Sequence, residues 1–236
     1  MKHANQFKAG VRDGIPICLG YFAVSFAFGI QAAETGLTPF EAGMLSLLNV
    51  TSAGQFAGLS VIAAAGSYIE LAVLQFIINL RYMLMSAALS QKLDSATGTL
   101  PRLLIAYGVT DEIFGVSVTR PGKLDPFFSY GCTIISVLGW VGGTVTGASA
   151  GAILPERLIS ALGVALYGMF IAIIIPPARE NKKIMYCVLA AMVMSAVFAC
   201  APVLKNLSGG MRIIIVTVAV AAIFAKMFPV EEEGAS

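Results

Sequence analysis

The sequence predicts an all-α integral membrane protein, a polytopic bundle of transmembrane helices, from its composition and its long apolar runs. Of its 236 residues, 58% are hydrophobic and only 12% are charged, and the mean hydropathy is +0.85. A soluble domain carries roughly 25% charged residues, so this chain has too few polar side chains to cover a water-facing surface. The apolar runs are continuous and not alternating, which argues against the strands of a membrane barrel.

Eight apolar runs approach the length of about 20 residues that crosses the hydrocarbon core. We expect them to form a single transmembrane domain over residues 1–236. The predicted helices are 15–33, 40–65, 68–90, 102–119, 126–152, 156–176, 184–204 and 211–228. The fourth is short and contains two acidic residues, so seven crossings with a re-entrant fourth segment is the alternative.

Local signals support these boundaries. Thr38 and Glu41 have the spacing of a capping box, and Ser67 and Glu70 repeat it. Several prolines fall beside the proposed ends, where a helix tolerates them. Because similar runs follow the first one, 15–33 is interpreted as a helix and not as a cleaved leader.

Lysine and arginine in the short loops indicate the orientation. With eight crossings and a cytoplasmic N-terminus, nine of these residues lie inside and five outside, in the sense of the positive-inside rule. This arrangement puts Lys92 outside and Arg120 inside. An internal repeat is also possible, because segments 29–54 and 147–169 share a helix end, a proline turn and a helix; two such helices also arise by chance.

Several function classes leave no trace in the sequence. The four cysteines lie in apolar runs without metal-ligand spacing, and the single histidine is His3 in the polar N-terminal tail. We therefore expect no metal site and no cofactor. Hydrolase, zinc-protease and Walker motifs are absent, so we expect no enzyme, and transport energy must come from a gradient or a separate protein. The sequence contains no basic cluster interleaved with aromatic residues, so nothing in it indicates that the protein binds nucleic acid.

Arg81 is the most informative residue, because it lies inside the predicted third helix. A charge at bilayer depth costs at least about 2.5–3.5 kcal/mol and persists where it meets a counter-charge, a water-filled cavity or a substrate. One interpretation is an ion pair with Asp111 or Glu112. The other is a substrate site, because the guanidinium fork grips a carboxylate in two places. Both can hold together.

Other polar side chains at membrane depth cluster in the first half of the chain. They are candidates for substrate binding or for hydrogen bonds between helices. These residues are Asn49, Ser52 and Gln55 in the second predicted helix and Gln75 and Asn79 in the third. Asp111 and Glu112 are candidates for proton coupling or an ion pair, unless the fourth segment is incompletely buried and both acids face water.

Glycines recur at four-residue spacing on two predicted helices, which lets neighbouring helices approach closely. The stripe consists of Gly139, Gly143, Gly147 and Gly151, and a shorter pair is Gly54 and Gly58. Packing within the chain is one interpretation, and docking of a partner subunit is the other.

Four motifs together resemble the AzlC-type branched-chain amino-acid exporters. They are Gly14–Gly29, Asn49–Ala57, Asn79–Tyr82 and Thr110–Glu112. The resemblance covers nearly the first half of the chain residue by residue, whereas the second half matches mainly in hydropathy and length. It implies one half of a two-component exporter in the bacterial cytoplasmic (inner) membrane. The implied partner is a small AzlD-type membrane subunit, and the implied substrates are branched-chain amino acids such as valine.

These observations predict a multi-pass permease that exports branched-chain amino acids, with proton coupling as the expected energy source. The alternative is a non-catalytic membrane subunit or channel-like scaffold of a multi-component transport complex. A membrane enzyme using Asp111 and Glu112 as an acid–base pair is disfavoured, because adjacent helical residues point about 100° apart.

Overall fold

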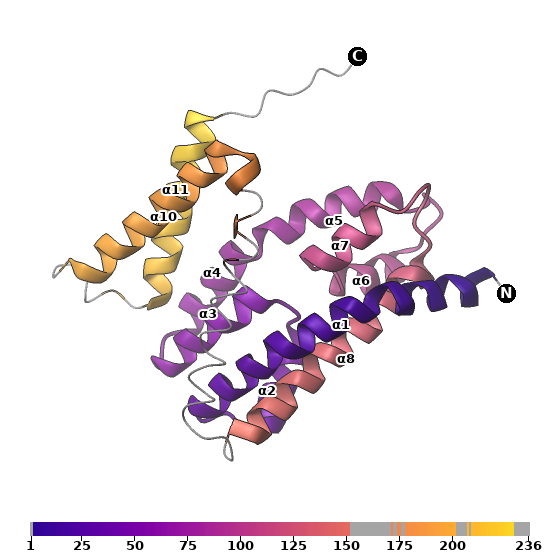
Figure 1. The fold of residues 1–236 in the computed structure, drawn as a ribbon, viewed down its shortest axis with the longest axis horizontal. Helices are drawn as coiled ribbons and strands as arrows, with labels where there is room; N and C mark the ends of the chain where they lie inside the picture. The colour runs from indigo at the N-terminus through magenta and orange to yellow at the C-terminus, as the bar shows by residue number, and fades with distance from the viewer. Residues whose placement is uncertain are drawn as a thin grey trace. The chain divides into compact units, whose positions relative to one another are not determined.

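The computed structural model describes residues 2–151, 171, 174–175, 178–201, 207 and 209–228. These residues are helical or form turns between helices, and they contain no strand (Figure 1). The predicted all-helical class is confirmed. The chain divides into two compact units, one of residues 1–56 with 78–163 and one of residues 57–77 with 164–236.

In the part of the chain that the structure describes, four helices are long and apolar enough to cross a membrane. They are His3–Glu34, Pro126–Ala150, Lys182–Cys200 and Gly210–Met227. The pair α4 (Tyr68–Ile78) and α5 (Leu80–Lys92) makes a fifth if it is one interrupted span. Most of the predicted helix 156–176 and most of the second half of the predicted repeat lie outside the described residues.

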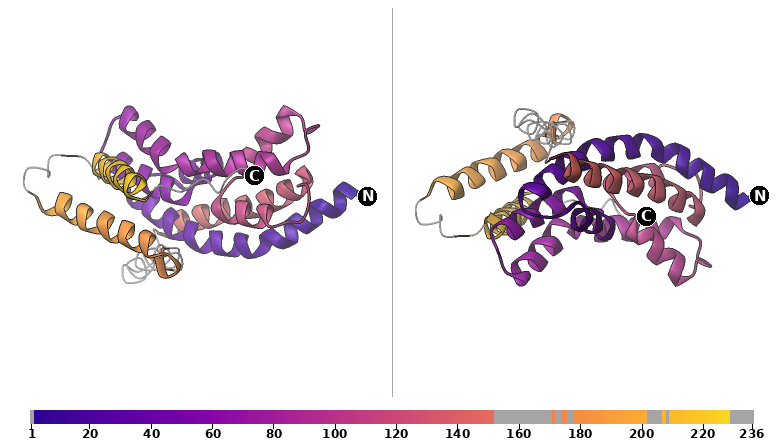
Figure 2. Two further views of the ribbon diagram at one scale, coloured as in Figure 1. Left: turned by 90° about the horizontal axis from the view of Figure 1, so that it is seen from above. Right: turned by 90° about the horizontal axis from the view of Figure 1, so that it is seen from below.

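The first unit is built on α1 (Lys2–Glu34) and α8 (Pro126–Gly151), which lie side by side along most of their length (Figure 2). Small residues make this close approach possible. A Cβ atom on three glycines of α8 would collide with backbone carbonyl oxygens of α1, at Gly139, Gly143 and Gly147. This part of the predicted stripe therefore packs against the chain's own first helix. Gly151 is the last residue of α8.

Three predicted helices are interrupted where the sequence indicated continuous spans. The segment 40–65 divides into α2 (Pro39–Leu48) and α3 (Ser52–Ala63), and 68–90 divides into α4 and α5 at Asn79. The segment 102–119 divides into α6 (Thr99–Tyr107) and α7 (Asp111–Val118). Each interruption contains an Asn or Thr, which are residue types that favour helix ends, and at the third the Thr110 hydroxyl accepts a hydrogen bond from the Ile113 amide. At 1.5 Å per residue, α2 and α6 reach about half of the 30 Å hydrocarbon core.

The fourth predicted segment folds back on itself as a hairpin of α6 and α7. Its far end is fixed to the C-terminal end of α5, because the Lys92 ammonium group donates hydrogen bonds to the carbonyl oxygens of Val118 and Arg120. Its near end is held there too, since Arg102 donates to the Asp94 carbonyl, 3.1 Å away, in the loop after α5. Both ends of this segment thus lie beside the C-terminal end of α5, as the alternative of a re-entrant segment predicts, and the placement of Lys92 and Arg120 at opposite faces is wrong.

The capping box that begins α2 is confirmed. The Thr38 hydroxyl accepts a hydrogen bond from the Glu41 amide at 3.2 Å, and the Glu41 carboxylate accepts one from the Thr38 amide at 2.8 Å. Pro39 occupies the first helical turn, where its missing N–H costs nothing. These signals fix the start of the half-length helix that leads into the first interruption.

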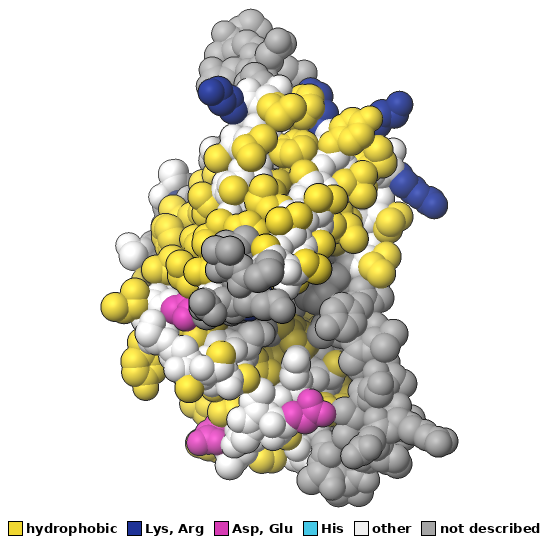
Figure 3. Space-filling model, turned by 90° about the vertical axis from the view of Figure 1, so that its left-hand side faces the viewer, with side chains coloured by type: hydrophobic (Ala, Val, Ile, Leu, Met, Phe, Trp, Pro, Cys, Tyr) yellow, Lys and Arg dark blue, Asp and Glu magenta, His cyan; other side chains and the backbone are white. Residues whose placement is uncertain are grey.

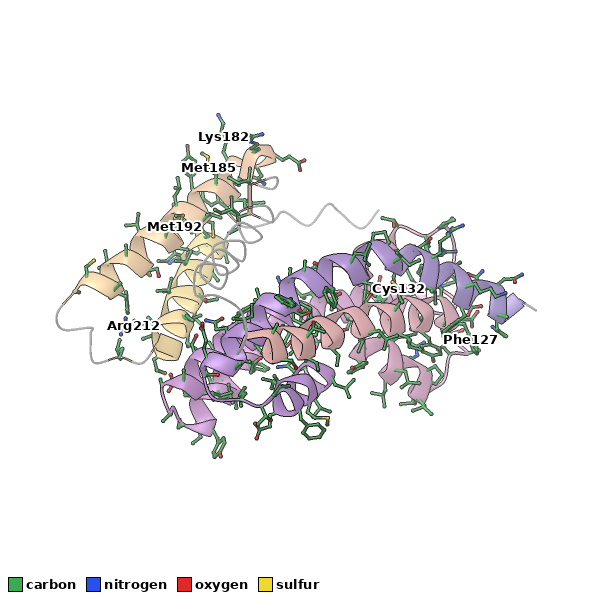
Figure 4. The ribbon with its side chains drawn as sticks, turned by 60° about the horizontal axis from the view of Figure 1, so that its bottom comes forward. Phe127, Cys132, Lys182, Met185, Met192 and Arg212 are labelled. Carbon is green, nitrogen blue, oxygen red and sulfur yellow. The ribbon has the colours of Figure 1, made fainter. Side chains whose placement is uncertain are left out.

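The second unit contains the rest of α3, most of α4, and the helices α10 (Lys182–Cys200) and α11 (Gly209–Met227), which pack on each other. No described residue of α10 is buried. Lys182, Met185 and Met192 lie along it, with Lys182 at its start (Figure 4). Hydrophobic side chains cover most of the upper part of the face in Figure 3, with lysine or arginine at its edge and aspartate or glutamate below. Such a surface is typical of helices that contact lipid.

Candidate functional site

The three interruptions meet in the first unit. Tyr107, at the end of α6, donates a 2.6 Å hydrogen bond to the carbonyl oxygen of Leu47, near the end of α2. Thr51, between α2 and α3, donates a 2.8 Å hydrogen bond to the side chain of Asn79, between α4 and α5. These bonds bring together the ends of half-length helices, an arrangement that forms substrate sites in many secondary transporters.

An ion pair joins two of the interrupted segments. The Arg81 Nη2 atom lies 2.9 Å from Asp111 Oδ2, with both side chains half-buried. Arg81 belongs to the first turn of α5 and Asp111 to the first turn of α7. An acid is favourable at this position because a helix N-terminus carries partial positive charge. The guanidinium also lies 5.1 Å from the centre of the Tyr82 ring, within the range of a cation–π contact.

A second polar contact connects α1 to the same place. The Tyr21 hydroxyl donates to the Glu112 carboxylate at 2.5 Å and shares a 2.6 Å hydrogen bond with the Thr110 hydroxyl. Thr110 is also the N-cap of α7 and accepts a hydrogen bond from the Ile113 amide. Tyr21 therefore binds both the tip of the re-entrant hairpin and one of its two acids.

Behind these groups lies a buried hydrogen-bond chain. The Trp140 indole N–H donates to the Gln55 side-chain oxygen at 2.7 Å, and the Gln55 amide donates to Ser46 at 2.9 Å. Ser46 and Thr144 are 2.7 Å apart. The Gln55 side chain is only 1% exposed. Gln55 therefore supports the site from behind and does not face it.

A small cavity lies among these groups. Its volume is about 10 Å³, which is about the room that one water molecule needs. The lining residues are Tyr21, Val50, Ser52, Tyr82, Thr110, Asp111, Glu112 and Trp140. The cavity thus combines two acids, four side-chain hydroxyl groups and apolar ring surface. A molecule larger than water requires the helix ends around it to separate.

The predicted site residues divide into three groups. Arg81, Asn79, Asp111 and Glu112 come together as expected, and Ser52 lines the cavity. Asn49 caps the C-terminus of α2 and contributes its carbonyl oxygen to the turn at Thr51.

Two further predictions fall in other places. Gln75 belongs to the second unit, where its side chain lies beside Gly58. A Cβ at Gly58 would meet Gln75 on α4, whereas Gly54 is buried in α3 within the first unit.

Sequence reasoning missed the aromatic residues of the site, Tyr21, Tyr82 and Trp140. One signal was available, because Trp140 is the single tryptophan in the chain and lies inside an apolar helix. A tryptophan buried in this way usually finds a hydrogen-bond partner for its indole N–H. The two tyrosines lie in runs that also suit plain helix packing, so their partners emerge only from the fold.

Comparison with known proteins gives a consistent result. The family described as AzlC protein matches residues 16–154. An uncharacterized membrane protein of Archaeoglobus fulgidus is 33% identical over 72% of this chain and 75% of its own length. The inner membrane protein YgaZ of Escherichia coli is 29% identical over 79% of this chain and 78% of its own length. No solved structure matches. With its helical membrane fold and a family match across most of the first unit, the chain belongs to the AzlC family of membrane transport proteins.

Proposed function

We propose that the protein exports branched-chain amino acids such as valine across the bacterial cytoplasmic membrane. In this proposal it works with a small AzlD-type membrane subunit and keeps its N-terminus in the cytoplasm. The observation that carries the proposal is the Arg81–Asp111 ion pair at the meeting point of three interrupted helices. Paired opposite charges at this depth suit a ligand that carries both charges itself.

The substrate's two charges match the ion pair. An amino acid carries a carboxylate and an ammonium group on the same carbon atom, so it can insert between the two side chains and replace each partner. Arg81 then holds the carboxylate through its planar fork. Asp111 receives the ammonium group, and the carboxylate of Glu112 and the side chains of Asn79 and Ser52 are close enough to the same helix ends to take part.

The apolar part of the substrate also has a counterpart. Val50 and Trp140 line the cavity, and the Tyr21 and Trp140 rings stand edge-on with their centres 5.3 Å apart. A branched aliphatic side chain gains about 25 cal/mol for each Å² of its surface that such groups cover. The recognition therefore favours a short hydrophobic amino acid over a polar one.

Proton coupling is the energy source that the site supports best. Asp111 and Glu112 are adjacent acids beside the substrate position, and the pairing of Asp111 with Arg81 changes when a substrate carboxylate occupies the guanidinium. Whichever of the two acids does not hold the ammonium group is then left without a counter-charge in a poorly hydrated place, where it takes up a proton more easily. Binding of the substrate and protonation of the acid are then linked.

The test is export of labelled valine, measured as uptake into inside-out vesicles from cells that express the chain with and without its small partner. Arg81→Ala should abolish uptake, and Arg81→Lys should retain a small part, because lysine keeps the charge and loses the fork. Arg12→Ala is the matched control, since Arg12 is exposed and pairs with its neighbour Asp13. Normal uptake by Arg81→Ala would remove the proposed role of this residue.

The alternative of a non-transporting scaffold subunit has one observation in its favour, the near-closed cavity. It predicts that valine does not raise the melting temperature of the purified chain, alone or with its partner. The exporter predicts a rise that disappears in Arg81→Ala and remains in Arg12→Ala.

A further inference from the structure

Two stretches of the first unit carry the same residue pattern. Segments 19–27 in α1 and 80–88 in α5 are identical at four of nine positions, which follow the order Leu-x-Tyr-x-x-x-Ser-x-Ala. The tyrosines of this pattern are Tyr21 and Tyr82. A second match lies at the helix interruptions, where Val50-Thr51 precedes α3 and Val109-Thr110 precedes α7. The order of the elements is also the same, because the helix that carries the tyrosine, α1 or α5, is followed by two helices of 8–12 residues.

The two copies run in opposite directions. Arg120 marks one end of the unit, because its guanidinium contacts Asp13 at 3.2 Å and its carbonyl oxygen accepts a hydrogen bond from Lys92. Asp13 precedes Tyr21, so α1 runs from this end toward the site. Lys92 follows Tyr82, so α5 runs from the site toward the same end. Repeats of opposite direction are common in secondary transporters, where substrate sites lie between the two copies.

Each tyrosine contacts the threonine of the other copy. Tyr21 of the first copy is hydrogen-bonded to Thr110 of the second at 2.6 Å. Tyr82 of the second copy donates to Thr51 of the first at 3.4 Å. This exchange of partners follows from a two-fold relation between the copies and is not expected from two unrelated helix pairs.

The two contacts are unequal in this structure. The Tyr21 contact is short and is extended by the 2.5 Å hydrogen bond to Glu112, whereas the Tyr82 contact is stretched to 3.4 Å. The charges are unequal too. Arg81 corresponds to Gly20, and Asp111 and Glu112 correspond to Ser52 and Ala53, so the second copy supplies all three charged groups.

We infer that segments 19–52 and 80–111 form an inverted repeat and that Tyr21 and Tyr82 are paired positioning residues that close the site in alternation. In the arrangement described here the Tyr21–Thr110 contact is closed and the Tyr82–Thr51 contact is loose. In the opposite arrangement the copies exchange roles, so Tyr82–Thr51 tightens and Tyr21–Thr110 opens. The inference deepens the proposed transport function and rests on it, but it does not depend on the identity of the substrate.

The test compares the accessibility of the site from the two sides of the membrane. Ser52→Cys, introduced after the four native cysteines are replaced by alanine, places one thiol in the cavity lining. A membrane-impermeant maleimide then labels it in spheroplasts or in inside-out vesicles, and the ratio of the two rates is measured. Tyr21→Phe and Tyr82→Phe each remove one hydroxyl and keep the ring. Tyr130→Phe is the control, because Tyr130 contacts the Phe127 ring at the far end of α8.

We expect the two variants to move the labelling ratio in opposite directions, by about tenfold each, and the double variant to return toward the parent ratio. A tenfold change corresponds to about 1.4 kcal/mol. Tyr130→Phe should leave the ratio unchanged. A shift in the same direction for both variants, or no shift for either, would overturn the inference. If one tyrosine variant fails to fold, Thr110→Val and Thr51→Val remove the same two contacts. These two variants must then shift the labelling ratio in opposite directions.

This result is independent of valine. If the ratio shifts as expected and valine is not exported, the proposed substrate is wrong and the paired closure stands. If valine is exported and the two tyrosine variants do not shift the labelling ratio in opposite directions, the transport proposal stands and the paired closure is wrong.

Discussion

The indole N–H of Trp140 donates a 2.7 Å hydrogen bond to the Gln55 side chain, and this bond joins α8 to α3 directly behind the candidate site. Both side chains are almost fully buried, at 2% and 1% exposure. Gln55→Leu should lower the free energy of unfolding by about 1–3 kcal/mol, because it leaves the indole N–H without an acceptor. Thermal unfolding in detergent measures this loss.

The control for this prediction is Gln31→Leu, which changes an exposed glutamine of α1 in the same way. Trp140→Phe should also be destabilising, and the double variant should lose less than the sum of the two single losses, because both remove the same bond. Additive losses would mean that the two side chains do not act through this contact.

Asp111→Asn should separate substrate binding from proton coupling. The amide keeps the size and a hydrogen-bond acceptor for the ammonium group but cannot exchange a proton. We expect exchange of labelled for unlabelled valine to continue, whereas export driven by a pH gradient should fall at least about tenfold, the effect of losing about 1.4 kcal/mol of coupling. Asp94→Asn is the control, because Asp94 lies in the loop after α5. Full pH-driven export in Asp111→Asn would exclude Asp111 as the coupling acid.

The charged part of the site was predictable from the sequence for an electrostatic reason. Arg81 and Asp111 both lie in apolar surroundings, and two isolated opposite charges in one bilayer are more stable together than apart. The ion pair that the structure contains is one of the two interpretations that the sequence left open. The role of Arg81 in binding a substrate stays a prediction.

The helix interruptions were not predictable in the same way. Hydropathy averages over about 20 residues, so one Asn79 between two apolar stretches does not lower the mean enough to divide a span. What stabilises the interruption is a partner from elsewhere in the chain, here the hydroxyl of Thr51. The aromatic partners of the site were hidden for a related reason, because the contact of Tyr21 with Thr110 joins residues 89 positions apart.

Lys92→Met should loosen the re-entrant hairpin without unfolding the rest of the unit. Lys92 donates to the carbonyl oxygens of Val118 and Arg120, and methionine keeps the apolar stem without the donors. Backbone amides of α6 and α7 should then exchange hydrogen faster, by about tenfold for each 1.4 kcal/mol lost, while those of α1 and α8 keep their rates. Lys8→Met, at an exposed position of α1, is the control. Equal protection of α6 and α7 in both variants would show that the hairpin does not depend on this anchor.

Two glycine substitutions should affect stability in opposite directions. A Cβ at Gly147 would collide with the carbonyl oxygen of Phe26, so Gly147→Ala must push α8 away from α1. Forcing atoms into such a contact costs about 1–3 kcal/mol.

At Gly20, also inside a long helix, no atom lies within 4 Å of the added Cβ. Gly20→Ala should therefore stabilise the protein by up to about 1 kcal/mol, since alanine is the better helix former. The measurement is the melting temperature of each purified variant, compared with that of the parent protein. A loss of similar size in both would mean that helix contact at Gly147 is not what limits the approach of α1 and α8.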